Sequence, residues 1–122
     1  VTMINLITEK KKIQIRFKLP QQAIDMLPER KAEDDNVFTN LKYNAWTGQQ
    51  LKMWALQSGI QKDISSHTAR HSFAVHQLKN GTTMYHLSKL LGHKTSLTTE
   101  RHYADYATED LDKIMDNVYG NE

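Results

Sequence analysis

Residues 66–106, SHTARHSFAVHQLKNGTTMYHLSKLLGHKTSLTTERHYADY, contain the patterns that decide the fold. Ser66 opens a segment in which apolar side chains recur at helical spacing, from Phe73 to Leu78. The pair Asn80-Gly81 follows, and this pair is typical of a helix end because both residues tolerate the left-handed conformation. The segment therefore predicts a helix from about residue 66 to residue 79.

Two further helices are predicted in the same stretch. Thr83 can begin a short apolar helix that ends at Leu91, where Gly92 permits the turn. Thr98 or Thr99 can cap the next helix, since a threonine hydroxyl accepts a hydrogen bond from the free N–H groups of a first turn.

Helical patterns also flank this central stretch. Thr47 followed by Gln50 has the form of a capping box, and Gly59 marks the end of the helix it would begin. We expect the inner face of that helix to contain Leu51, Trp54, Ala55 and Ser58. A last amphipathic helix is predicted near the end of the chain, with an apolar face formed by Leu111, Ile114, Met115 and Val118.

The beginning of the chain has a different periodicity. Residues 3–7 form an apolar run, and residues 13–18 alternate strictly between apolar and polar side chains, which is typical of a half-buried strand. Residues 8–11 supply a polar hairpin turn. Pro20 then suits the first position of a helix that Pro28 ends. The predicted fold class is mainly α, with a small β-hairpin at its N-terminal edge.

Composition limits the possible functions. The 122 residues fit one domain, since compact domains most often have about 100–150 residues. With 39% hydrophobic and 25% charged residues, the chain has an ordinary water-soluble composition. No apolar run approaches the roughly 20 residues of a membrane helix, so we expect no membrane partner. The absence of cysteine excludes disulfide scaffolds, cysteine nucleophiles and thiolate metal sites.

Charge is unevenly distributed although the net charge is only +2. Residues 9–18 contain five basic residues and one acidic residue, whereas residues 104–122 contain six acidic residues and one basic residue. The basic segment favours an anionic partner, and a solvated charge run is the simpler alternative.

Six histidines lie within residues 67–102. They can be ordinary surface or core residues of a helical domain. His67 and His71 have the i, i+4 spacing of zinc ligands, but Thr68 stands where the zinc proteases with this motif have their glutamate base. The sequence therefore predicts no metal site.

A third interpretation of the histidines is that they take part in phosphate chemistry. His67 and Arg70 share one face in the first turn of a predicted helix, where backbone N–H groups and the helix dipole favour an anion. An arginine fork binds phosphate with two hydrogen bonds, and histidine exchanges protons near neutral pH. His93 follows a helix end, and Tyr103 lies in a segment flanked by polar residues, outside an apolar stripe. That tyrosine is either a surface aromatic or a nucleophile.

The string HTARHSFA at residues 67–74, followed by LLGH at residues 90–93 and then by Thr98, Thr99 and Tyr103, closely resembles the catalytic domain of the tyrosine recombinase (phage integrase) family. The variant with the HTARH string resembles those in integrases of bacterial mobile elements. The resemblance extends from the hairpin onward over essentially the whole chain. One HxxR motif is a weak signal, whereas the three motifs in this order are a strong one.

The resemblance implies site-specific DNA recombination or integration without metal, ATP or another cofactor. A tyrosine attacks the scissile phosphate to form a 3′-phosphotyrosyl intermediate. By position, Tyr103 would be the nucleophile, Arg70 a phosphate clamp, and His67 and His93 the imidazoles that contact phosphate and handle protons. Lys10 would protonate the leaving 5′-oxygen. The remaining residues expected to contact DNA are Lys11, Lys12, Arg16 and His71, and Lys11 and Lys12 are also alternatives to Lys10.

Two departures from the family pattern stand out. No arginine precedes Arg16, so the family's first phosphate-binding arginine is missing. We therefore expect residues 1–122 to be a catalytic-domain fragment that lacks this arginine and the helical core-binding domain. Tyr103 follows His93 by ten residues rather than the family's usual nine, so Tyr106 remains an alternative nucleophile.

The expected partner is double-stranded DNA, with a homotetramer in the synapse of the full-length protein and accessory DNA-bending proteins as further possibilities. The family implies a bacterial, cytoplasmic location at the nucleoid. Two alternatives to a recombinase are a catalytically silent DNA-binding or regulatory module and an unrelated helical metal or interaction domain.

Overall fold

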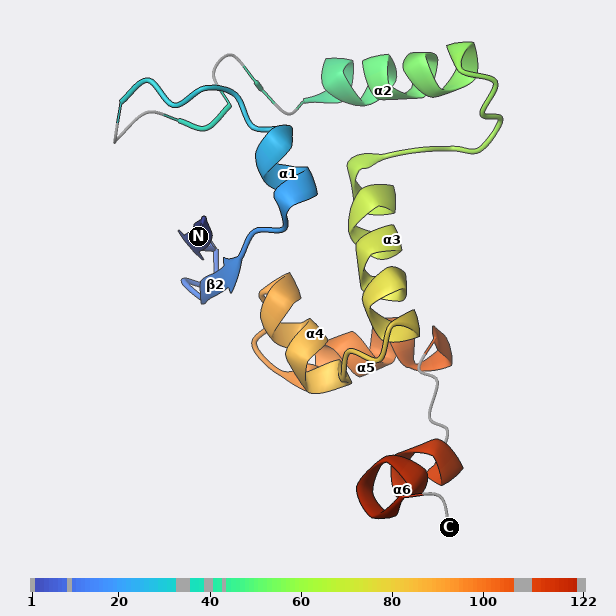
Figure 1. Cartoon of the computed structure of the whole chain (residues 1–122). Helices are drawn as coiled ribbons and strands as arrows, with labels where there is room; N and C mark the ends of the chain where they lie inside the picture. The colour runs from blue at the N-terminus through green and yellow to red at the C-terminus, as the bar shows by residue number, and fades with distance from the viewer. Residues whose placement is uncertain are drawn as a thin grey trace. The chain divides into compact units, whose positions relative to one another are not determined.

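A computed structural model of the chain describes residues 2–8, 10–32, 36–38, 41–42, 44–106 and 111–120. The elements in chain order (Figure 1) are β1 (Met3–Ile7), β2 (Gln14–Lys18), α1 (Gln21–Asp25), α2 (Ala45–Gln57), α3 (Ser66–Lys79), α4 (Met84–Leu91), α5 (Ser96–Tyr103), the 3₁₀ helix η1 (Ala104–Tyr106) and α6 (Leu111–Tyr119). The predicted fold class is confirmed. The contacts divide the chain into unit 1, residues 1–72, and unit 2, residues 73–122, with the boundary inside α3.

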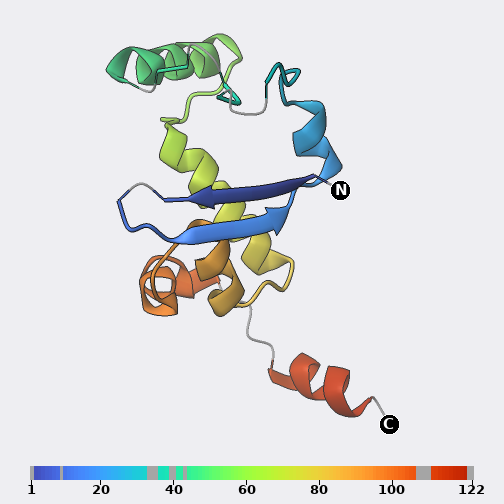
Figure 2. The same ribbon diagram turned by 90° about the vertical axis from the view of Figure 1, so that its left-hand side faces the viewer.

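The hairpin of unit 1 pairs β1 with β2 in antiparallel register, from Met3 opposite Lys18 to Ile7 opposite Gln14 (Figure 2). The predicted alternation is confirmed, since Ile13, Ile15 and Phe17 are partly buried and the polar residues between them are exposed.

The turn of the hairpin is closed by Thr8. Its N–H donates to the carbonyl of Ile13 at 2.9 Å, and its hydroxyl accepts from the N–H of Ile13 at 3.0 Å. Lys12 has a φ of 51°, which makes it the one non-glycine residue with positive φ in the described part of the chain. The left-handed conformation of Lys12 closes a turn that contains no glycine.

Helix α1 is shorter than predicted. Pro20 is its N-cap rather than its first residue, and the helix ends at Asp25, so Leu27 lies beyond it. The predicted helix, which was expected to end at Pro28, was therefore two residues too long. The ring of a proline disfavours the helical conformation of the residue before it, here Leu27, which accounts for the earlier end.

Helix α2 begins at Ala45, and its N-cap is Asn44 rather than the predicted Thr47. The Oδ1 of Asn44 accepts a hydrogen bond from the N–H of Thr47 at 3.1 Å. The hydroxyl of Thr47 instead donates to the carbonyl of Lys42 at 2.6 Å. The inner face of α2 was predicted in part: Ala55 is buried and Leu51 is partly buried, whereas Trp54 and Ser58 are exposed.

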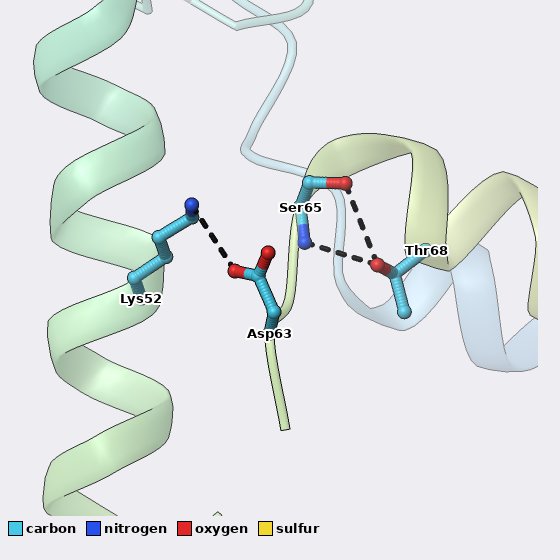
Figure 3. A network of polar contacts seen from close by, with 4 residues as sticks. All are labelled: Lys52, Asp63, Ser65 and Thr68. Carbon is cyan, nitrogen blue, oxygen red and sulfur yellow. Dashed lines mark hydrogen bonds and ion pairs between the residues drawn. The ribbon is translucent and has the colours of Figure 1, made fainter. Parts of the chain in front are cut away.

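The segment between α2 and α3 is fixed by polar contacts (Figure 3). The Nζ of Lys52 lies 3.1 Å from a carboxylate oxygen of Asp63, and both side chains are exposed, so the pair adds little stability. At the start of α3, Thr68 N–H donates to Ser65 O and Ser65 N–H donates to Thr68 Oγ1, both at 3.0 Å. The Thr68 hydroxyl thus reaches back to the N–H of Ser65, as the third residue does in one half of a capping box, while the carbonyl of Ser65 accepts from the N–H of Thr68.

The core of unit 2 contains the end of α3, α4 and the last turn of α5. Its buried residues are Ala74, Leu78, Leu87, Leu91 and Tyr103, with Val75 and Met84 packed at its edge. Helix α3 was predicted with its correct end, but Phe73 is exposed and takes no part in this core. Tyr103 is only 7% exposed, so its expected place outside the apolar core was wrong.

Helix α4 was predicted correctly. Its N-cap, Thr83, accepts a hydrogen bond from the N–H of His86, and Gly92 ends it with a φ of 69°. The cap predicted for the next helix was wrong, because α5 begins at Ser96 with Thr95 as N-cap, and both Thr98 and Thr99 lie inside it. Helices α4 and α5 pack against each other (Figure 1).

Helix α6 is formed as predicted and has no buried residue. Its apolar residues, Leu111, Ile114, Met115, Val118 and Tyr119, are all more than half exposed. Within the described ranges, none of the helices has the length and apolar character required to span a bilayer.

Candidate active site

His93 is held in a defined position by the end of α4. Gly92 and His93 donate their N–H groups to Lys89 O and Ser88 O, which are the two hydrogen bonds of a Schellman motif. The imidazole Nδ1 then lies 2.7 Å from the hydroxyl of Thr99, a residue with no exposed surface. The turn fixes the backbone and the buried hydroxyl fixes the ring of a partly buried histidine.

His102 is the second imidazole of this region. Its Nδ1 lies 2.8 Å from the carbonyl oxygen of Thr98, one helical turn earlier on α5. Its ring centroid is 6.5 Å from that of His93 and 6.2 Å from that of Tyr103. His102 itself is exposed. No function was predicted for His102, although the sequence shows that it directly precedes Tyr103.

Tyr103 combines a core position with a position beside His102, whose ring also lies near that of His93. Its side chain belongs to the buried cluster that includes Leu87 and Leu91. Tyr106, the alternative nucleophile, lies in η1 and is 40% exposed. The structure therefore brings His93, His102 and Tyr103 together in unit 2. We name these three residues the α5 cluster.

The other predicted phosphate-binding residues lie on the first two turns of α3 in unit 1. His67, Arg70 and His71 are all exposed there, and the two hydrogen bonds between Ser65 and Thr68 fix the turn that presents them. Their spacing of three and four residues places them on neighbouring positions of the helix surface.

The basic residues of the hairpin were predicted to contact DNA. Lys10 and Lys11 lie in the turn, Lys12 ends it, and Arg16 lies on β2 opposite Asn5; all four are exposed. The hairpin therefore presents three consecutive lysines and one arginine on a strand to solvent.

Among the described residues, no group of three or more histidine and acidic side chains has the arrangement of a metal site. The chemistry that the α5 cluster can perform is nucleophilic attack and proton transfer, since it contains one phenol and two imidazoles. Thr99 was missed as a functional residue, because the sequence suggested a cap and not a buried partner of His93.

Comparison with known proteins identifies the family of the chain. Residues 2–110 match the model of the phage integrase family. This chain belongs to that family.

Individual relatives are recombinases and an integrase. The chain is 40% identical over 87 residues to tyrosine recombinase XerD of Listeria monocytogenes, covering 68% of this chain and 29% of that protein. It is 27% identical over 112 residues to tyrosine recombinase XerC of Rickettsia peacockii, covering 88% of this chain and 36% of that protein. The fold matches the catalytic domain of bacteriophage HP1 integrase with a TM-score of 0.67 and 25% identity, over 98% of this chain and 68% of that one.

Proposed function

We propose that the chain carries out the strand-cleavage and rejoining step of site-specific DNA recombination or integration, through a 3′-phosphotyrosyl intermediate and without metal or ATP. Membership of the phage integrase family supports the reaction class. The observation that carries the proposal is the α5 cluster, in which the ring of a family-position tyrosine lies beside that of His102, which in turn lies near His93, an imidazole fixed by a buried hydroxyl.

Each proposed role follows from the chemistry of its side chain. Tyr103 attacks the scissile phosphorus, Arg70 binds non-bridging phosphate oxygens with two hydrogen bonds, and His67 and His93 donate hydrogen bonds to phosphate oxygens. Lys10 transfers its proton to the leaving 5′-oxygen. The Tyr103 Oη–P bond forms as the P–O5′ bond breaks, and the reverse attack by a 5′-hydroxyl restores a continuous strand.

Tyr103 is preferred to Tyr106 because of its neighbours. The ring of Tyr103 lies 6.2 Å from that of His102, within the α5 cluster. The buried core around Tyr103 also limits the directions its ring can take, which favours one attack geometry over many.

The proposed partner is double-stranded DNA, which the lysines of the hairpin and Arg16 would contact through phosphates together with His71. A homotetramer in the synapse, accessory DNA-bending proteins and a cytoplasmic, nucleoid-associated location belong to the same proposal. We also propose that residues 1–122 act together with the family's first arginine and core-binding domain.

A catalytically silent DNA-binding module is the second candidate, and one observation favours it. Tyr103 is only 7% exposed, whereas a nucleophile has to reach the phosphate it attacks. This candidate predicts salt-sensitive binding to duplex DNA without any covalent product.

A covalent trap distinguishes the two candidates. The protein encoded by the complete reading frame is incubated with a pool of nicked duplexes of randomised sequence, and DNA that stays attached to protein under denaturing conditions is isolated and sequenced. The selected duplex is then tested with wild type, Tyr103→Phe and Tyr106→Phe. The proposal expects a protease-sensitive adduct that only Tyr103→Phe abolishes. DNA binding without an adduct from the wild type contradicts the recombinase function and favours the silent module.

A further inference from the structure

The hydrogen bond of His102 determines where its proton is. A carbonyl oxygen only accepts hydrogen bonds, so the Nδ1 that lies 2.8 Å from Thr98 O carries hydrogen. In a neutral imidazole the other nitrogen, Nε2, then has a free lone pair. His102 is therefore held in the tautomer that accepts a proton at Nε2.

His93 is held in a different way. Its Nδ1 is bound to the hydroxyl of Thr99, and a hydroxyl can donate or accept. This bond persists in either tautomer of His93, so Nε2 of His93 is able to donate a hydrogen bond to an anion. The two imidazoles of the α5 cluster are thus fixed for different tasks.

His102 also has the right neighbours for a proton acceptor. It directly precedes Tyr103, and its ring lies 6.2 Å from that of Tyr103 and 6.5 Å from that of His93. It is exposed, whereas Tyr103 is buried, so water can stabilise the imidazolium that forms when His102 takes up the tyrosine's proton. Histidine is the side chain whose charge changes most readily near neutral pH.

We propose that His102 is the general base of the cleavage step, accepting the phenolic proton of Tyr103 at Nε2. The inference rests on the proposed function and adds a residue to its machinery. As the Tyr103 Oη–P bond forms, the phenolic proton moves to Nε2, and His102 becomes an imidazolium. In the rejoining step the imidazolium returns this proton to the phenolate oxygen as the phosphotyrosyl bond breaks, so the cycle is balanced.

The key variant is His102→Asn. The side-chain amide of asparagine can still donate to Thr98 O, but it has no basic nitrogen. His86→Asn is the matched control, since His86 is an exposed histidine of unit 2 whose ring also contacts the preceding tyrosine, with centroids 5.6 Å apart. His102→Gln provides a second variant without a base, and thermal unfolding of all variants checks that they fold.

Single-turnover cleavage of the selected duplex is the measurement. General bases contribute about 10²–10⁴-fold to rate, so we expect His102→Asn to lower the cleavage rate constant at least about 100-fold and to abolish the loss of rate toward acid pH that the proposal expects of the wild type. His86→Asn should keep both the rate and the pH profile of the wild type.

A 5′-phosphorothiolate duplex separates the base from the acid. Its sulfur leaving group departs without being protonated, so this substrate should restore cleavage by Lys10→Ala but not by His102→Asn. Wild-type rate and pH profile in His102→Asn, or its rescue by the sulfur substrate, overturns the role of His102 and leaves the recombinase function standing. If the wild type and His86→Asn form no adduct at all, the proposed function fails, and the role of His102 fails with it.

Discussion

The Nδ1 of His93 lies 2.7 Å from the hydroxyl of Thr99, and that hydroxyl belongs to a fully buried residue. The contact joins the turn after α4 to the inner face of α5. It therefore fixes a candidate phosphate-binding imidazole against the helix that carries the candidate nucleophile, Tyr103. The position of the His93 imidazole therefore depends on how α5, the helix of Tyr103, is packed.

Replacing Thr99 with valine tests this dependence. Valine has nearly the same shape as threonine but leaves Nδ1 of His93 without its partner, which costs about 1–3 kcal/mol for a buried polar group. A displaced catalytic group can lower the rate about 100-fold, so we expect a loss of this size in covalent adduct formation by Thr99→Val. The ring ¹⁵N shifts of His93 should show a changed hydrogen-bond state in the same variant.

Two control variants test whether the effect is specific to the hydroxyl of Thr99. Thr99→Ser retains a hydroxyl and should recover most of the activity. Thr98→Val removes a neighbouring hydroxyl while keeping the backbone carbonyl that His102 uses, so it should cleave at the wild-type rate. Equal losses in Thr98→Val and Thr99→Val would assign the effect to general disturbance of α5 rather than to His93.

Lys12→Gly should stabilise the hairpin. Lys12 has a φ of 51°, and a left-handed conformation costs an ordinary residue about 1–2 kcal/mol, part of which glycine recovers. We expect a gain of about 0.5–1 kcal/mol in the stability of the β1–β2 pairing, measured by amide hydrogen exchange at Ile15 and Phe17. Because Lys10 is retained, cleavage should persist.

The control for this change is Lys11→Gly. Lys11 lies in the same turn but has no positive φ, so glycine there only adds unfolded-state entropy and should destabilise the hairpin by about 0.5–1 kcal/mol. Faster amide exchange in Lys12→Gly than in the wild type contradicts the strained turn. Loss of cleavage in Lys12→Gly would instead point to Lys12 as the proton donor.

Leu87→Ala should loosen the core in which Tyr103 is packed. Leu87 is fully buried, and removal of a buried leucine side chain costs about 2–5 kcal/mol. Leu97→Ala is the matched change at a position that is 52% exposed, where the cost should stay within about 0.5 kcal/mol. Amide exchange in α4, which lies in unit 2, measures both. Similar exchange in the two variants would contradict the described core.

Helix α5 shows why sequence reasoning missed part of this core. Its buried or partly buried positions, Ser96, Thr98, Thr99 and Tyr103, all carry hydroxyl groups, although Ser96, Thr99 and Tyr103 are spaced by three and four residues as on one helix face. A search for apolar periodicity does not detect such a face. The threonines were therefore interpreted as caps, and Tyr103 was expected outside the core.

Other elements were predictable because their signals are local. Thr83 and Gly92 bound α4 as expected, and Ile13, Ile15 and Phe17 alternate in burial as expected. The sequence also shows the order in which the candidate site residues His67, Arg70, His93 and Tyr103 follow one another. The pairing of His93 with Thr99 was not, because it depends on how the turn after α4 meets α5.

The N-cap of α2 was predictable only in part, and it gives a further prediction. Asn44 and Thr47 have similar preferences for the cap, and the structure assigns it to Asn44, whose Oδ1 accepts from Thr47 N–H at 3.1 Å. Asn44→Ala should destabilise α2 by about 1 kcal/mol, with faster amide exchange in its first turn. Asn44→Asp keeps the acceptor and should retain the wild-type exchange rate. Unchanged exchange in Asn44→Ala would show that the cap adds nothing.

Salt dependence tests the hairpin as a DNA contact. Arg16 is exposed on β2, and each neutralised phosphate contributes about 0.9 to the slope of log K against log salt concentration. We expect Arg16→Gln to reduce this slope by about 0.9 and to weaken binding to all duplexes alike, because a phosphate contact reads no sequence.

Two variants separate this contact from other effects. Lys113→Gln removes one positive charge from α6, between Asp112 and Asp116, and should leave the slope unchanged. Tyr103→Phe should also retain the wild-type slope, since the covalent step follows binding. A slope that Arg16→Gln leaves unchanged, or that Lys113→Gln lowers equally, means that overall charge rather than the hairpin determines the affinity for DNA.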